Sequence, residues 1–576
     1  MSTLEHRLAT SVLVVGTGGS GLRAAIELAE AGVAVIAVGR RASGDAHTVL
    51  ATGGVNAALA TTDHADTWEQ HAADTLRESR LLADPRAVLA VTRQAAQGIH
   101  DLERFGMRFD RQDDGRIAQR YFGAHTYRRT AFAGDRTGRE MQRVLRERAE
   151  RLAVPVLPRL YVTRLLVDDG TVFGAYGFDT ADGSRYLVHA DAVILATGGH
   201  TRIWRHTSSR RDENTGDSLR LAAEAGARLR DPELVQFHPS GLLKPENAAG
   251  TLVGEAARGE GGILLNNLGE RFMERYDPER MELAGRDRVA LAAYTEIREG
   301  RGTRAGGVWL DLSHLPRETV LARLPRVHRM LLDLQMLDVT RDPIEIAPTA
   351  HYSMGGVRVR PEDQGTDIDG LFAIGEAASG LHGANRLEGN SLTELLVHGR
   401  VAGRAAAEYS AGLTGQRRSL GSVRAAQADV DRLLAADGDQ NVRALQRSVR
   451  RLMTEHAGVV RDEAGLSAGL AALDEIEARM EDAGTHVDIG GFEDLAHAYD
   501  LRSAVLAARA TLECALERRE TRGCHHRSDH PGLDPALRVN LVWSPETGVR
   551  REPVPPIPTD IAELMHDVPT DGKLLE

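Results

Sequence analysis

The 576-residue chain is poor in cysteine and has only Cys514 and Cys524. Two cysteines in so long a chain indicate a reducing compartment, and their spacing fits neither a metal site nor the ligands of an iron–sulfur cluster. We therefore expect no metal in this chain. Long hydrophobic runs are absent too, since no stretch of about 18 apolar residues predicts a membrane span. The first ten residues lack an apolar core of signal-peptide length, so we expect a cytoplasmic protein.

Lysine is almost missing: only Lys244 and Lys573 occur, and arginine provides nearly all of the positive charge. The formal net charge is −12, which argues against nucleic-acid binding, because that function needs a basic stripe. Apolar residues make up 42% of the chain and charged residues 27%, as in ordinary globular proteins. A chain of this length is expected to form two to four domains.

Glycine is plentiful, with 59 residues, and its first cluster lies in a strand–turn–helix pattern. An apolar strand at residues 12–15 leads into a glycine turn, an apolar-periodic helix and a second strand at 33–38. In this context G-x-G-x-x-G predicts a dinucleotide site. The first glycine allows the tight turn, the second lets the backbone approach a pyrophosphate, and the third lets the helix pack on the strand. These glycines are Gly16, Gly18 and Gly21.

The second strand ends at Gly39 and Arg40, where a dinucleotide site usually has an acidic residue for the ribose, and this disfavours plain NAD. Two later apolar strands also end in glycine. One stops at Thr197-Gly198-Gly199, and the other precedes the glycine-dense loop of residues 375–389. Three such ends, far apart in sequence, imply one nucleotide domain interrupted by an insertion. Beyond about residue 412, helical periodicity with charged outer faces predicts a bundle.

Several histidines, glutamates and arginines occur in glycine-rich polar segments. Each alone has an ordinary structural explanation: Arg286 beside Asp287, for example, is typical of a surface ion pair. Together they indicate a site that clamps an anionic substrate, because guanidinium groups bind carboxylates through paired hydrogen bonds. The set is His238, Glu255, Arg258, Arg286, His351 and Arg386.

The motifs, in their order, resemble the flavoprotein subunits of succinate dehydrogenase and fumarate reductase, and their relative L-aspartate oxidase. The resemblance covers nearly the whole chain and includes "DRTGRE", "NTGDSLRLAAEAGA", "GERFMERYDP", "EIREGRG" and "RRETRGCHHRSDHP". It implies an α/β fold: a Rossmann-like FAD-binding domain, an inserted α+β capping domain and a C-terminal helical domain. We expect the FAD-binding domain at 1–240 and 345–412, the cap at 241–344, the helical domain at 413–535 and an extended surface tail at 536–576.

The resemblance implies FAD as the cofactor. In the membrane-complex members, a histidine before threonine is bonded covalently to the 8α-methyl group of FAD, and His47 in "AHTVLATGG" matches that position. The aspartate oxidases lack this histidine and bind FAD without a covalent bond. We therefore expect His47 to be the attachment point of FAD and not an ordinary loop histidine. Besides the glycine turn, the implied FAD contacts are Thr48, Gly53, Gly54, Asp217, Glu376, Ser391 and Leu392.

The resemblance also assigns the catalytic set. Arg286 matches the general acid/base that moves a proton at a substrate carbon while the flavin N5 exchanges a hydride. A side chain with so high a pKa works as an acid only if it is quickly reprotonated, and Glu255 and Arg258 match the relay behind it. His238, His351 and Arg386 match the residues that hold two substrate carboxylates. The implied reaction is succinate/fumarate interconversion, with electrons passing to an iron–sulfur protein subunit. Through that subunit the chain would be connected to a membrane anchor. We therefore expect it to lie peripherally on the inner face of the cell membrane.

Three positions bear on the substrate. Gly254 stands where the family usually has threonine, whose hydroxyl binds a substrate carboxylate, so a hydrogen bond of about 1.5–3 kcal/mol is lost unless another donor replaces it. Glu388 stands in place of a glycine, and we expect it to point away from the clamp. Phe122 stands where aspartate oxidase has a glutamate for the substrate ammonium, which favours a C4 dicarboxylate over an amino acid. A free-standing oxidase of the aspartate type and a non-catalytic FAD-binding subunit remain the alternatives.

Overall fold

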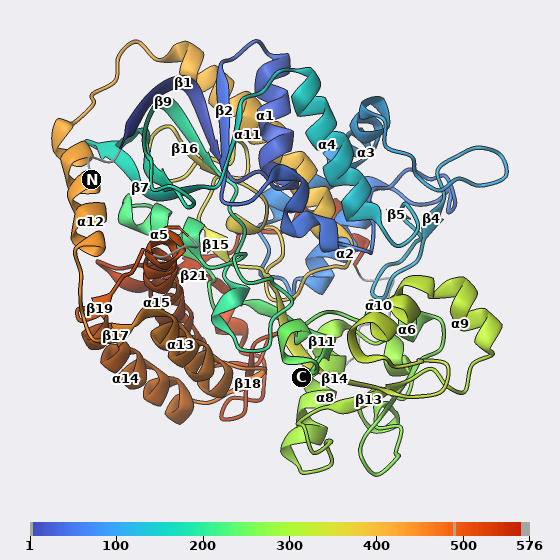
Figure 1. Cartoon of the computed structure of the whole chain (residues 1–576). Coiled ribbons are helices and arrows are strands. Elements are labelled where there is room, and N and C mark those ends of the chain that lie inside the picture. Colours follow the sequence, from blue (N-terminus) through green and yellow to red (C-terminus); the bar gives the residue numbers. More distant parts are fainter. Residues whose placement is uncertain (1–3, 488–490, 566–576) are drawn as a thin grey trace.

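The computed structural model describes residues 4–487 and 491–565, which are built around a seven-stranded sheet (Figure 1). The central strand β1 pairs in parallel with β2 and β9, and β16 joins β9 in parallel. Parallel strands end at the same edge of a sheet, so the three glycine loops predicted from the sequence meet there. The sheet consists of β6 (Val156–Pro158), β2 (Val35–Gly39), β1 (Glu5–Val15), β9 (Arg185–Leu195), β8 (Thr171–Asp179), β7 (Leu160–Asp168) and β16 (Leu371–Ala373).

β1 begins at Glu5 rather than at residue 12. Its first half pairs with β9 from Glu5 against Arg185 onward, but it is polar and half-buried, so it carries no apolar run that sequence analysis could detect. Only the second half, Val12–Val15, is fully buried.

One face of the sheet is covered by helices from both ends of the nucleotide-binding region. Leu22 and Ile26 of α1 and Leu396 of α11 form a common core with Val12 and Val14 of the sheet. The long helix α11 therefore packs against α1, the helix that follows the glycine turn. The helices of this part are α1 (Gly19–Glu30), α2 (Trp68–Glu78), α3 (Pro85–Phe105), α4 (Thr137–Arg151) and α11 (Asn390–Gly412), with a small sheet of β3 (Val55–Asn56), β5 (Thr130–Ala131) and β4 (Gln119–Arg120).

The predicted helical region packs against the other face. Tyr499 and Leu512 share a core with Phe178 and Tyr176 of the sheet, so this region is continuous with the nucleotide-binding part. The elements of this region are α12 (Leu420–Leu434), α13 (Val442–His456), α14 (Glu463–Met480) and α15 (Glu493–Glu517), with the short strand pairs β17 (Gln440–Asn441) with β19 (Ala483–Gly484) and β18 (Val460–Arg461) with β20 (His526–Arg527). Helix α5 (Asp217–Glu224), from the nucleotide-binding part, shares the same core.

A smaller unit with its own core lies beside the sheet, in yellow-green in Figure 1. Two long antiparallel strands, β11 and β14, connect it to the rest of the chain, and Leu242, Leu310 and Ile346 lie in its interior. Its elements are β11 (Val235–Leu242), β12 (Ile263–Leu265), β13 (Val308–Asp311), β14 (Ile344–Ser353), α6 (Ala256–Gly259), α7 (Met273–Tyr276), α8 (Arg286–Arg298), α9 (Arg317–Arg323) and α10 (Pro325–Gln335). The exact domain boundaries stay a prediction.

The C-terminal segment is not an extended tail over its described part. It forms a hairpin that completes a sheet with strands from more than 180 residues earlier, and Ile561 of the last helix is buried in a cluster with Leu76. Such distant pairing leaves no local sequence signal. The elements are β15 (Gly356–Val357), β10 (Leu229–Arg230), β21 (Val539–Ser544), β22 (Gly548–Pro553) and α16 (Thr559–Glu563). No helix in the described ranges is long and apolar enough to cross a bilayer.

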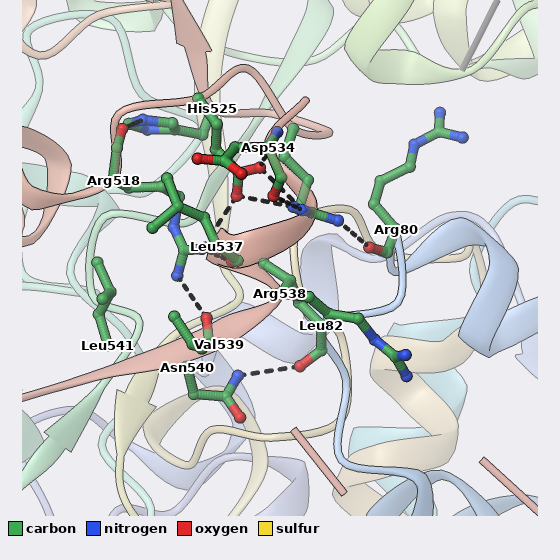
Figure 2. A network of polar contacts seen from close by, with 12 residues as sticks. Arg80, Leu82, Arg518, His525, Asp534, Leu537, Arg538, Val539, Asn540 and Leu541 are labelled. Carbon is green, nitrogen blue, oxygen red and sulfur yellow. Dashed lines mark hydrogen bonds and ion pairs between the residues drawn. The ribbon is translucent and has the colours of Figure 1, made fainter. Parts of the chain in front are cut away.

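Buried polar side chains bind the C-terminal segment to the rest of the chain. Arg518 is fully buried and forms ion pairs with Glu233 at 2.7 Å and Asp231 at 3.1 Å. It also donates to the carbonyl of Val539, and Asn540 donates to the carbonyl of Leu82 (Figure 2). The C-terminal hairpin is thus tied by side chains to the segments that precede α3 and β11.

Candidate active site

A cavity of about 550 Å³ begins at the glycine loops of the sheet and reaches the strands of the smaller unit. It brings together nearly all of the residues predicted from the sequence. Two of them do not line it: Gly21, which packs inside the turn, and Arg258, which is buried behind Glu255. Those that line it are Gly16, Gly18, His47, Thr48, Gly53, Gly54, Phe122, Asp217, His238, Glu255, Arg286, His351, Glu376, Arg386, Ser391 and Leu392.

The glycine turn has the shape that a pyrophosphate requires. Gly16 has φ +118°, and a Cβ there would lie 2.2 Å from the carbonyl oxygen of Ala196. A Cβ on Gly21 would lie 1.9 Å from the carbonyl oxygen of Gly16, so this helix can approach the strand only with glycine. Helix α1 then begins at Gly19, whose N–H donates to the hydroxyl of Thr48 at 3.1 Å. The positive end of α1 therefore faces the cavity, as anion binding requires.

Arg40, in the place of the usual acidic residue, lines the cavity and is held from behind by the helical region. Its guanidinium donates to both carboxylate oxygens of Asp500 in α15, at 2.8 and 2.9 Å, and lies over the ring of Tyr161. The Tyr161 hydroxyl donates to Asp217 at 3.0 Å. Burial, and then the neighbouring Asp500, raise the pKa of Asp217. The helical region thus holds Arg40 and Tyr161 in place at one end of the cavity, which the sequence alone did not indicate.

His47 lies in the short 3₁₀ turn of residues 47–50, with Nδ1 2.9 Å from the carboxylate of Glu213. Burial lowers the pKa of His47, but the hydrogen bond and charge of Glu213 outweigh it and raise the pKa above its usual value. Burial likewise opposes ionisation of Glu213, yet His47 and Arg210 bring its pKa down to about 2. Because the carboxylate accepts from Nδ1, the neutral ring has its lone pair on Nε2. We found no sequence signal for Glu213.

Arg286 is the first residue of α8, and it is surrounded by acceptors. Its Nε donates to Glu255 at 3.2 Å, its Nη2 to Glu388 at 2.5 Å, and its Nη1 lies 3.4 Å from the amide oxygen of Gln236. Asp287 pairs instead with Arg80, at 2.9 Å. The local-pair explanation of Arg286 is therefore wrong. The expectation that Glu388 points away is wrong too, because Arg286 attracts its carboxyl into the cavity.

Behind Arg286, Glu255 contacts the buried Arg258 at 3.5 Å. Arg258 donates to the carbonyl of Glu282 at 2.5 Å, and its Nε and Nη2 have no other hydrogen-bond partner within the described ranges. Burial lowers the pKa of Arg258. Glu255 would be harder to ionise because of burial, but Glu388, Arg258 and Arg286 bring its pKa down to about 2. Arg286 and Glu255 are thus joined by a hydrogen bond, and Glu255 and Arg258 by an ion pair, so the three side chains lie in one row.

The two histidines and Arg386 line the cavity beside Arg286. The rings of His238 and His351 are 5.4 Å apart, edge to face. Burial, and then the charge of Arg286, lower both histidine pKa values well below normal, so both rings are neutral. Nδ1 of His238 accepts from the N–H of Ser240 at 3.2 Å, so its proton is on Nε2, where it can be donated.

Arg386 is held on two sides, by the ring of Tyr352 at 4.5 Å and by Gln236, to which Nη2 donates at 3.0 Å. Its Nε has no partner in the part of the chain that the structure describes. Gln236 therefore orients both Arg286 and Arg386. Gln236 was not among the residues predicted from the sequence, although it lies two residues before His238 and a strand places such residues on the same face.

The fold and this cavity define an FAD-binding flavoprotein, and comparison with known proteins agrees. Residues 11–392 match the model of an FAD binding domain, and residues 446–555 match the fumarate reductase flavoprotein C-terminal model. The chain belongs to the family of succinate dehydrogenase and fumarate reductase flavoprotein subunits.

Individual relatives are similar over nearly their full length. A fumarate reductase (CoM/CoB) subunit of Methanothermobacter marburgensis is 41% identical, over 92% of this chain and 96% of that protein. The succinate dehydrogenase flavoprotein subunit of Rickettsia bellii is 36% identical, over 94% and 96%. Among solved structures, Sdh1 of Mycobacterium smegmatis has a TM-score of 0.88 at 36% identity, covering 96% of each chain. The E. coli quinol fumarate reductase has a TM-score of 0.90 at 31% identity, covering 96% of this chain and 99% of the other.

Proposed function

We propose that this flavoprotein interconverts succinate and fumarate. The observation that carries the proposal is the position of Arg286 in one cavity, hydrogen-bonded to the carboxylate of Glu255 and beside three further side chains that can donate to a carboxylate. A dicarboxylate has two anionic ends, and the neutral His238 and His351 together with Arg386 offer donors for them. The names of relatives given above support the same reaction class.

In the oxidation of succinate, one C–H bond is lost as a hydride and the neighbouring one as a proton. FAD, when bound, supplies the hydride acceptor, or the hydride donor in the reverse reaction. Arg286 exchanges the proton at the other carbon. Because a guanidinium gives up its proton reluctantly, the negative Glu255 at 3.2 Å and Arg258 behind it restore the proton state of Arg286 after each turnover. Gln236 maintains the spacing between Arg286 and Arg386.

We also propose that FAD is bonded covalently to His47. The support is the tautomer: Glu213 accepts from Nδ1 and leaves Nε2 as the nucleophilic nitrogen, with no hydrogen bond of its own among the described residues. Thr48 next to it binds the N-terminus of α1, so this loop is fixed to the pyrophosphate end of the cavity.

The electrons that FAD exchanges with the substrate need a further acceptor or donor. Both cysteines are buried singly and free, so they provide no cluster. We propose that the electron acceptor or donor is an iron–sulfur protein and that, through it, the chain takes a peripheral position at a membrane. Relatives described as subunits of fumarate reductase and of succinate dehydrogenase support a multi-subunit enzyme.

A second candidate is oxidation of aspartate by the free-standing chain. It is favoured by one observation: Glu388 brings a carboxyl into the cavity that Phe122 also lines, where it could meet a substrate ammonium. A dye-linked assay with succinate, fumarate and aspartate tests both. Turnover of succinate or fumarate well above that of aspartate is expected, and aspartate as the preferred substrate would overturn the proposal.

A further inference from the structure

Glu388 is a carboxyl that lines the cavity beside Arg286 and has no part in the proposed mechanism. It lies in the loop before α11, and its side chain is 11% exposed. A Cβ on Gly53 would lie 3.9 Å from its Oε1 and 3.7 Å from the ring of Phe122. With Nη2 of Arg286 at 2.5 Å, the carboxyl of Glu388 uses a donor of this arginine that a substrate carboxylate could otherwise bind.

The surroundings of Glu388 hold more positive than negative charge. Burial raises the pKa of Glu388 to about 8; Arg286 opposes this shift, whereas Glu255 adds to it through its charge and through a hydrogen bond between the two carboxyls. Such a pair holds one proton between two acids. The charged groups that face Glu388 are Arg286 of α8, Glu255 and Arg258 at α6, Arg386 of its own loop and Arg120 of β4.

We propose that Glu388 makes dicarboxylate binding proton-coupled: the dianion binds when Glu388 carries a proton and is opposed when Glu388 is a carboxylate bound to Arg286. As a carboxylate, Glu388 occupies a donor of Arg286 and adds like charge beside the anion. As an acid it has an O–H to donate, so it can bind a substrate carboxylate. The inference rests on the proposed function, because it concerns the same site and the same substrate class.

The sign of the pH dependence follows from linkage. A dianion that favours protonated Glu388 raises the pKa of this group in the complex above its value of about 8 in the free enzyme. Below that value Glu388 already carries the proton, so affinity is independent of pH. Above it, each complex formed takes up one proton, and the Kd rises tenfold for each pH unit.

The test is equilibrium binding of malonate, a dicarboxylate without the reacting carbon–carbon bond, to the FAD-loaded protein between pH 6 and 9.5. Flavin absorbance gives the Kd, and calorimetry in buffers of different ionisation enthalpy counts the protons taken up. We expect a constant Kd to about pH 8 and a tenfold rise per unit beyond it. Glu388→Gln and Glu388→Gly should both remove the rise. Glu260→Gln, at an exposed glutamate just after α6, should keep it.

The outcomes separate this inference from the proposed function. Malonate binding with a Kd that stays flat to pH 9.5, or a rise that persists in Glu388→Gln, overturns the role of Glu388 and leaves the dicarboxylate proposal standing. Absence of malonate binding at every pH overturns both. Aspartate binding more tightly than malonate, with this preference lost in Glu388→Gln, overturns proton coupling and assigns Glu388 to a substrate ammonium.

Discussion

Replacing Arg286 by lysine separates its charge from its geometry. The guanidinium uses three nitrogens toward three acceptors: Glu255, Glu388 and Gln236. The single ammonium of lysine is a point charge and cannot meet all three. An ammonium that meets one of these groups leaves the others, so the arrangement that joins this position to Glu255 while Glu388 and Gln236 are also met is lost. The positive charge of the site is kept, but the proton route is cut.

The expected loss is mainly in turnover. A positioned general acid or base contributes about 10²–10⁴-fold, so kcat of Arg286→Lys should fall by that factor, equivalent to roughly 3–5.5 kcal/mol in the barrier. Dicarboxylate Kd should change less than about tenfold, because His238, His351 and Arg386 are untouched and an interaction made only in the transition state leaves ground-state binding intact.

The assay is dye-linked succinate oxidation and fumarate reduction, with malonate Kd and flavin absorbance measured on the same sample. Arg298→Lys provides the matched control, since Arg298 is exposed at the other end of α8, and it should retain full activity. Near-native kcat in Arg286→Lys in either direction would refute the assignment of proton transfer to this residue.

Three further outcomes are expected. His47→Ser should retain FAD that acid denaturation releases, whereas the wild-type polypeptide should keep its yellow fluorescence on a denaturing gel; full release of FAD from the wild type would contradict the covalent bond. Gly254→Thr should tighten succinate binding by up to about tenfold, because it adds a hydrogen-bond donor worth roughly 1.5 kcal/mol. The new Cβ would lie 3.4 Å from the hydroxyl oxygen of Thr52, so there is room for it. An unchanged Kd would show that another group already donates there. Arg518→Met should destabilise the fold by about 3–5 kcal/mol, because Asp231 and Glu233 lose their buried ion-pair partner. The measurement is the denaturant midpoint of unfolding. A midpoint equal to that of the wild type would show that these carboxylates become protonated or hydrated at little cost.

The features predicted correctly from the sequence are those formed by residues that are consecutive in the chain. The turn at Gly16 is recognisable because strand, turn and helix are consecutive, and the parallel pairing of β1 with β9 then places the later glycine loops beside it. The orientation of Glu388 was mispredicted because its partner is 102 residues away and nothing in "RLEGN" refers to it. The replacement of the usual acidic residue by Arg40 was visible in the sequence. Its partner Asp500 could not be predicted, because it is 460 residues away. The described part of the tail was missed for the same reason.

The C-terminal hairpin also determines when the cavity can become complete during synthesis. Asp231, four residues before β11, is bonded by Arg518, Asn540 and the N–H of Leu541. About 150 residues separate Arg386, the last arginine of the clamp, from Leu541. At roughly 5–20 residues per second, a ribosome needs about 8–30 s for this stretch. During that interval every residue proposed here to contact the substrate already exists, while the support under β11 does not. Cofactor loading is therefore expected after release of the chain, and nascent chains stopped before residue 539 should not retain FAD.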